Sequence, residues 1–138
     1  MASAPKSAKP LKIVLAPAAR SDIREALLWS HERFGERAAV RYRKLVKQAI
    51  RDIAIDPTRP GSVERTELAR GIRTYHLFFS RDRAKSELGR VGRPRHFLVY
   101  RRRGNAIDLV RVLHDARDLE RHLPQDFLKS EEPTSGGT

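Results

Sequence analysis

The stretch LVRVLHDARDLERHLP, residues 109–124, begins with aliphatic residues typical of a β-strand and ends at a proline. His114 and Asp115 stand at the junction and allow two interpretations. A catalytic pair would need a nucleophile or a cleft close by. Asp is also a preferred helix N-cap, and Asp118 adds negative charge near the same terminus. Capping accounts for every residue, so we interpret the stretch as a strand followed by a short helix.

The strand that begins this stretch is one of three consecutive predicted strands. Strands are predicted over residues 72–79, 95–102 and 106–114. The last two are separated by the tight turn 103–105, which predicts an antiparallel hairpin. The first two are separated by residues 80–94, which are too long and too polar for a tight turn.

The first half of the chain predicts a helical hairpin. After a short strand over 11–16, a helix is expected from Pro17 to Gly35, because proline suits the first turn and glycine ends helices. A second helix is expected from Glu36 to Ile55, because Asp56 and Pro57 end it. Two sets of residues recur at helical spacing and form the expected buried stripes. The first set is Ala19, Ile23, Leu27 and Phe34, and the second is Ala39, Tyr42, Val46, Ala49, Ile50 and Ile53.

These elements predict an α+β fold in the order β-α-α-β-β-β-α, with the helical hairpin packed on a small antiparallel sheet. We expect one domain over residues 11–124. Residues 1–10 and most of 125–138 lack the apolar residues needed for a packed core and are predicted to be disordered tails.

Composition narrows the class of protein. The chain has 138 residues, a formal net charge of +12 and no cysteine, so a polyanion or an acidic protein is the expected partner. Its apolar N-terminal run is too short to span a membrane, and a cytoplasmic location is expected. The five histidines have no metal-ligand spacing, so neither a metal site nor another cofactor is predicted.

Two basic surfaces are predicted. One is the outer face of the second helix, from Arg37 to Arg51, and the other covers residues 80–103, which hold nine basic residues against Asp82 and Glu87. Both surfaces suit phosphate groups. The insertion 80–94 has no aromatic residue for base stacking, and the chain has no recognition-helix motif, so sequence-specific nucleic-acid binding is not expected.

One function that the residue types allow is that of a ribonuclease. Cleavage of RNA by its own 2′-hydroxyl needs a base, an acid and a cation near the phosphate. His76, His96, Tyr100 and Arg73 are suitable side chains on two predicted strands. The strand register that would bring them together cannot be obtained from the sequence.

Four segments resemble the ParE toxins of type II toxin–antitoxin modules, within the RelE/ParE superfamily. They are PAARSDIREALLWSHERFG, AVRYRKLVKQAIRDIAIDP, LARGIRTY and LVRVLHDARDLERHLP, and the similarity covers about residues 11–124. The resemblance implies a toxin of the plasmid-stabilisation type, which inhibits DNA gyrase, through its A subunit, by binding rather than by catalysis. It also implies neutralisation by an acidic ParD-like antitoxin.

The resemblance implies two surfaces. Target binding is expected at Arg111, His114, Arg117 and Arg121, and antitoxin binding at Leu28, Trp29 and Val40. RelE enzymes instead cleave mRNA on the ribosome with lysines and a C-terminal tyrosine. Residues 57–71 here contain no lysine and the last predicted helix no tyrosine, which favours the ParE branch because arginine stays protonated and cannot act as a base. A RelE-like nuclease and a non-toxic module that binds only antitoxin remain the alternatives, and the insertion 80–94 departs from the ParE pattern.

Overall fold

The computed structural model describes residues 9–115 of the chain. Its elements are β1 (Lys12–Leu15), α1 (Pro17–Phe34), α2 (Glu36–Ile55), β2 (Ser62–Glu64), β3 (Ile72–His76), the 3₁₀ turn η1 (Leu77–Ser80), β4 (His96–Arg103) and β5 (Ala106–His114). Beyond Asp115, the predicted last helix lies outside the described residues, as do Arg117, Arg121 and almost all of both predicted tails. The domain limits therefore stay predictions.

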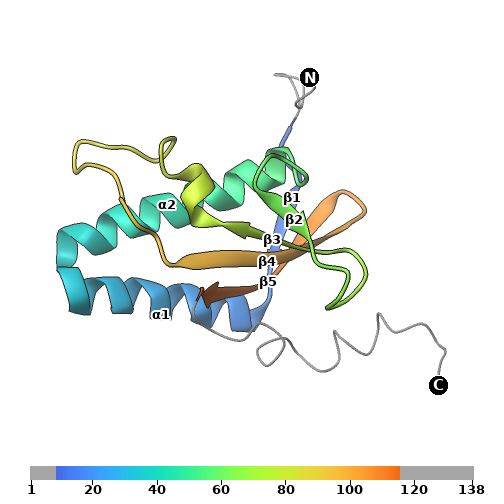
Figure 1. Ribbon diagram of the computed structural model, residues 1–138, viewed down its shortest axis with the longest axis horizontal. Coiled ribbons are helices and arrows are strands. Elements are labelled where there is room, and N and C mark those ends of the chain that lie inside the picture. Colours follow the sequence, from blue (N-terminus) through green and yellow to red (C-terminus); the bar gives the residue numbers. More distant parts are fainter. Residues whose placement is uncertain (1–8, 116–138) are drawn as a thin grey trace.

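Figure 1 shows two layers, with the hairpin of α1 and α2 lying along one face of a five-stranded sheet. The strand order is β1-β5-β4-β3-β2. Within the described residues, the predicted α+β class and element order are confirmed. The sheet is mixed rather than purely antiparallel, because β1 pairs in parallel with β5 and places Ile13 beside Ile107. Parallel strands need a long crossover connection, and the whole chain between β1 and β5 supplies it here.

A single residue, Gly35, joins the two helices. Its φ of 94° lies in the left-handed region, which explains why glycine stands at this sharp reversal. The bounds of α2 match the prediction from Glu36 to Ile55. Pro17 stands at the first turn of α1, as expected.

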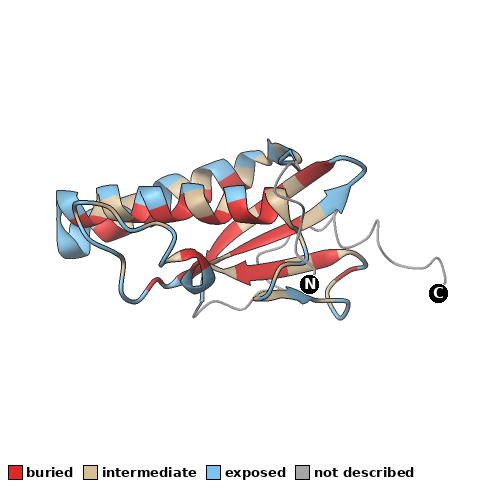
Figure 2. Cartoon of the chain, turned by 90° about the horizontal axis from the view of Figure 1, so that it is seen from above, coloured by how far each residue is buried: buried red, intermediate tan, exposed pale blue. Residues whose placement is uncertain are grey.

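The buried face of α1 differs from the predicted stripe. Figure 2 shows that the buried residues of both helices lie on the side facing the sheet. On α1 these are Ala19, Asp22, Ala26 and Ser30, whereas Phe34 is 66% exposed. The prediction for Phe34 was wrong because the helix ends at this residue, beyond the reach of the sheet. Small side chains let α1 approach the strands closely.

The polar connection 57–71 contains a strand that the sequence did not indicate. Ser62–Glu64 form β2, which pairs antiparallel with β3 at one edge of the sheet. Only three residues long, it carries no readable alternation of apolar and polar side chains.

The strand predicted over residues 72–79 ends early. β3 stops at His76, and the 3₁₀ turn η1 follows. The turn is held by polar contacts: the Phe78 amide donates to Nδ1 of His76, and the Ser80 hydroxyl donates to Asp52. Leu77 is buried although it is not in a strand, which is why the apolar residues after His76 resembled a continuation of the strand.

A β-bulge interrupts the pairing of β4 with β5. Val99 lies opposite Arg111 and Tyr100 opposite Leu109, so Val110 is the extra residue. Leu109 and Val112 then face the main core beneath the helices, while Val110 and Leu113 join a second cluster. The bulge sets the direction of every side chain after it. No helix among residues 9–115 is long and apolar enough to cross a membrane.

Candidate functional site

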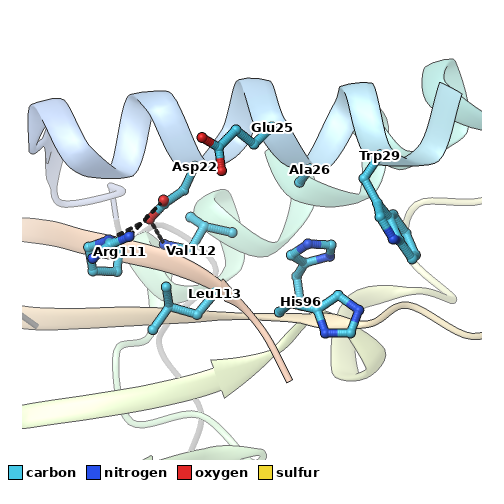
Figure 3. Close-up of a pocket in the computed structure, with 9 residues that line it drawn as sticks. Asp22, Glu25, Ala26, Trp29, His96, Arg111, Val112 and Leu113 are labelled. Atoms are coloured by element: carbon cyan, nitrogen blue, oxygen red, sulfur yellow. Dashed lines mark hydrogen bonds and ion pairs between the residues drawn. The ribbon is translucent and has the colours of Figure 1, made fainter. Parts of the chain in front are cut away.

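A cavity of about 470 Å³ opens between α1 and the ends of β4 and β5 (Figure 3). It is lined by Asp22, Glu25, Ala26, Trp29, His96, Arg111, Val112, Leu113 and His114. The cavity therefore brings together residues far apart in the sequence. The cavity is lined by Arg111 and His114, which were predicted to bind the target, and by Trp29, which was predicted to bind the antitoxin.

One wall of the cavity is an ion pair between α1 and β5. Arg111 donates from Nε and Nη2 to the two carboxylate oxygens of Asp22, at 2.7 and 3.0 Å. The Val112 amide donates to the same carboxylate at 2.9 Å. Hydrogen bonding to Asp22 raises the pKa of Arg111, so the guanidinium stays charged. Arg111 thus joins helix to sheet and is 19% exposed at its side chain.

A second wall holds a histidine whose protonation is determined by its neighbours. The Arg95 amide donates to the Tyr42 hydroxyl oxygen at 2.9 Å, and that hydroxyl lies 2.7 Å from Nδ1 of His96. An amide can only donate, so the phenol oxygen accepts from Arg95. Tyr42 of α2 therefore contacts both Arg95 and His96 at the start of β4.

Burial keeps His96 uncharged. Desolvation and the neighbouring His114 lower the pKa of His96 to about 4. Burial likewise raises the pKa of Tyr42, so the phenol keeps its hydrogen. The pair therefore presents a neutral imidazole at ordinary pH.

Two further aromatic rings, those of Trp29 and His114, lie against this pair. His96 and His114 lie directly opposite each other on β4 and β5, with ring centroids 5.2 Å apart. Trp29 meets both edge-to-face, at 5.3 and 5.6 Å, and also contacts Tyr42 at 5.9 Å. Trp29 extends from α1 toward His96 (Figure 3). The half-buried indole connects the helices to the strand ends.

Asp115 makes a cluster of its own where β5 ends. Its carboxylate lies 3.1 Å from Nε2 of His76 and 3.0 Å from Arg95. Partial burial alone would raise the pKa of Asp115, but hydrogen bonds from Arg95 and His76 outweigh it and lower the pKa. Its predicted role as an N-cap concerns a helix outside the described residues and stays a prediction.

The four residues of the ribonuclease alternative fall into three networks. Arg73 and Tyr100 meet at the Ser62 hydroxyl, at 2.7 and 2.5 Å. His96 is bonded to Tyr42, and His76 to Asp115. His96 and Tyr100 lie on the face of the sheet that the helices cover. His76 pairs with Phe97, which packs against the second cluster, so His76 lies on the other face. Ser62, which joins Arg73 to Tyr100, belongs to β2, the strand that the sequence did not indicate.

The predicted antitoxin residues differ in exposure. Leu28 is 56% exposed and Val40 is 37% exposed, as expected for residues outside the buried stripes. Trp29 instead packs partly against the core. The sequence did not indicate that Trp29 and Tyr42 contact His96 at the end of the strands. The spacing of apolar residues along a helix predicts which face is buried, but it does not predict hydrogen bonds. Residues 9–115 contain no group of side chains suited to hold a metal ion.

Comparison with known families agrees with this fold and its sequence. Residues 13–119 match the model of the family described as ParE toxin of type II toxin-antitoxin system, parDE. The chain belongs to the ParE toxin family. A solved structure of the chromosomal ParDE TA system from P. aeruginosa is 12% identical, with a TM-score of 0.55. The match covers 75% of this chain and 95% of that one, and it shows a shared fold. A search of curated proteins found no significant match.

Proposed function

We propose that this ParE-family chain inhibits DNA gyrase by binding and that an acidic ParD-like antitoxin neutralises it. The observation that carries the proposal is the family match over residues 13–119. The net charge of +12 supports an acidic partner, because opposite charge speeds encounter and suppresses wrong partners. We infer that the inhibition is non-catalytic.

The target surface is proposed around the end of β5, at Arg111, His114, Arg117 and Arg121. Two of these residues border the cavity beside Trp29. Because Arg111 pairs with Asp22, its replacement would disturb the fold as well as the surface. Arg117 and Arg121 are therefore the better positions for a test of target binding.

The antitoxin surface is proposed at the exposed apolar residues of the hairpin, Leu28 and Val40, together with Trp29. The two aliphatic side chains are more than a third exposed, and their burial by a partner would be favourable. Basic residues of α2 nearby, such as Arg43, would complement acidic side chains. Binding would then combine apolar contact with charge attraction.

A nuclease is less well supported. The four alternative residues belong to separate networks, and no lysine lies in 57–71 to act as a base. His96 is 5% exposed and already hydrogen-bonded through Nδ1. A nuclease and a non-toxic module both predict unchanged supercoiling, so mRNA cleavage on ribosomes and antitoxin binding are measured on the same sample to separate them.

The experiment is supercoiling of relaxed plasmid by gyrase, with the purified chain added alone or with its antitoxin. We expect inhibition that the antitoxin relieves. If the folded chain leaves supercoiling unchanged but cleaves mRNA on ribosomes, the nuclease is correct. If it does neither and still binds antitoxin, the chain is a non-toxic module.

Charge reversal tests the target surface. We expect Arg117→Glu with Arg121→Glu to abolish growth arrest without unfolding the chain, because both proposed target contacts would reverse their charge. The matched control is Arg37→Glu with Arg51→Glu, which changes net charge equally on the exposed outer face of α2. Growth arrest lost equally in both double variants would attribute the effect to overall charge and reject the proposed surface.

A further inference from the structure

A second, mainly apolar groove lies at the tip of the helical hairpin. It has a volume of about 280 Å³ and shares Trp29 and Tyr42 with the surroundings of the first cavity. One side comes from the helices and the other from residues 90–93 of the insertion, which reaches toward the hairpin turn in Figure 1. We call it the tip groove.

Aromatic rings form the helical side of the tip groove. Phe34 is 66% exposed, and its ring centroid lies 6.0 Å from that of Trp29 at an interplanar angle of 80°. The Arg33 guanidinium lies 5.8 Å from the indole centroid. Phe34 has no place in the core cluster, so its ring is available to a ligand.

Arginines form the rim. Arg41, Arg90 and Arg93 line the tip groove, and none of the described residues that line it is acidic. Arg41 donates to the Leu88 carbonyl at 3.2 Å, which holds its guanidinium beside the insertion. Arg90 pairs with Asp82, while Arg93 is exposed and makes no ion pair with residues 9–115. The tip groove therefore offers planar cations next to a flat apolar surface.

This combination matches one kind of ligand. Single-stranded nucleic acids bind where a positive groove follows the phosphates and aromatic side chains stack on the bases. A double helix keeps its bases stacked inside, so they could not stack on the Phe34 ring.

We propose that the tip groove binds an unpaired stretch of nucleic acid, with a base stacked on Phe34 and neighbouring phosphates held by Arg90 and Arg93. The contact is tolerant of sequence, because every base has a flat face. The inference goes beyond gyrase inhibition and does not depend on it. A chain that inhibits gyrase but fails the test below would lose only this site.

The single tryptophan of the chain makes the test direct. The purified full chain is titrated with a 12-nucleotide oligothymidylate, a duplex of equal length and heparin, and Trp29 emission is recorded. We expect the oligothymidylate to quench the emission and heparin, which has no bases, to leave it unchanged. Equal quenching by heparin would overturn the proposal.

Substitution of Phe34 tests stacking. We expect Phe34→Ala to weaken oligothymidylate binding about tenfold, as for loss of one base–aromatic stack, and to leave duplex binding unchanged. Phe78→Ala is the matched control, since Phe78 is also exposed and lies outside the tip groove. Unchanged single-strand affinity in a folded Phe34→Ala variant would overturn the proposal.

Substitution of Arg93 tests phosphate contact. We expect Arg93→Gln to reduce the slope of log affinity against log salt by roughly 0.7, the value for one phosphate of a single strand. Arg70→Gln, an exposed arginine outside the tip groove, should leave the slope unchanged. Equal changes in both variants would mean diffuse attraction and reject the site. Tighter, Phe34-dependent binding of a glutamate-rich peptide with one leucine would assign the tip groove to an acidic protein segment instead.

Discussion

Each helix of the hairpin buries one carboxylate against the rest of the molecule, and the two differ in what surrounds them. Asp52 of α2 is fully buried and accepts hydrogen bonds from Gln48, Ser80 and Arg83. Arg59 lies 3.6 Å away. Asp22 of α1 accepts hydrogen bonds from Arg111 and Val112 and borders the 470 Å³ cavity.

The surroundings of Asp52 are closed to solvent, whereas those of Asp22 are open to a cavity. Around Asp52, the donors come from α2, η1 and the loops that flank the sheet, and together they exclude solvent. Around Asp22, the ion pair closes only one side, and the aromatic rings of Trp29, His96 and His114 border the remaining space. A buried carboxylate therefore closes the structure around Asp52, whereas the one at Asp22 joins α1 to β5 beside an open cavity.

Replacing Asp52 should have the largest effect. We expect Asp52→Asn to lower the free energy of unfolding by about 3 kcal/mol, because one partner of a buried ionic network is lost while the arginines keep their charge. The Arg83 side chain is 56% exposed and can turn to water, which keeps the loss at the low end for buried pairs. Urea unfolding measures the change.

An exposed carboxylate provides the control for this prediction. Asp82 is 73% exposed and pairs with Arg90, so Asp82→Asn should change the free energy of unfolding by no more than about 0.5 kcal/mol. Similar losses for Asp52→Asn and Asp82→Asn would show that the Asp52 network does not stabilise the fold.

Acidification should have the second-largest effect, and it acts through His96 beside the cavity. The pKa of His96 is about 4 in the folded chain and 6.5 ordinarily, so the unfolded chain takes up a proton first as pH falls. Stability is therefore lost between pH 6.5 and 4, by about 2 kcal/mol from pH 7 to pH 5. Asp115, whose pKa is lowered from 3.8, loses its contribution only at still lower pH. Unfolding curves at the two pH values measure the slope.

Variants assign this pH dependence to one histidine. His96→Gln should flatten the loss between pH 7 and pH 5, whereas His31→Gln, at an exposed histidine, should keep it. An NMR titration of the His96 ring with a midpoint near 6.5 would contradict the proposed desolvation.

Replacing Asp22 should have the smallest effect of the three. We expect Asp22→Asn to lower the free energy of unfolding by about 1.5 kcal/mol, because the amide oxygen still accepts one hydrogen bond and water in the cavity can solvate Arg111. A loss as large as that of Asp52→Asn would mean that the cavity is closed in solution, and the contrast between the two carboxylates would fail.

Local patterns were sufficient for much of the fold. The bounds of α2 followed from its periodic apolar residues and from Pro57, and the β4–β5 hairpin followed from the turn at 103–105. These signals lie within one element or one turn, so the sequence carries them directly. The three residues of β2, the end of β3 at His76 and the bulge at Val110 depend on partners in other elements, and no pattern within one element revealed them.

The same distinction applies to the site. Sequence alone determined the ParE-like character of the chain, its positive charge and the chemical types near the end of β5, because these are properties of neighbouring residues. Only the tertiary structure decided that Arg111 is held by Asp22, that Tyr42 is hydrogen-bonded to His96, and that Phe34 and Trp29 stand beside Arg90 and Arg93. Each of these contacts joins residues more than 50 positions apart, and strand register and helix packing, not spacing in the chain, bring them together.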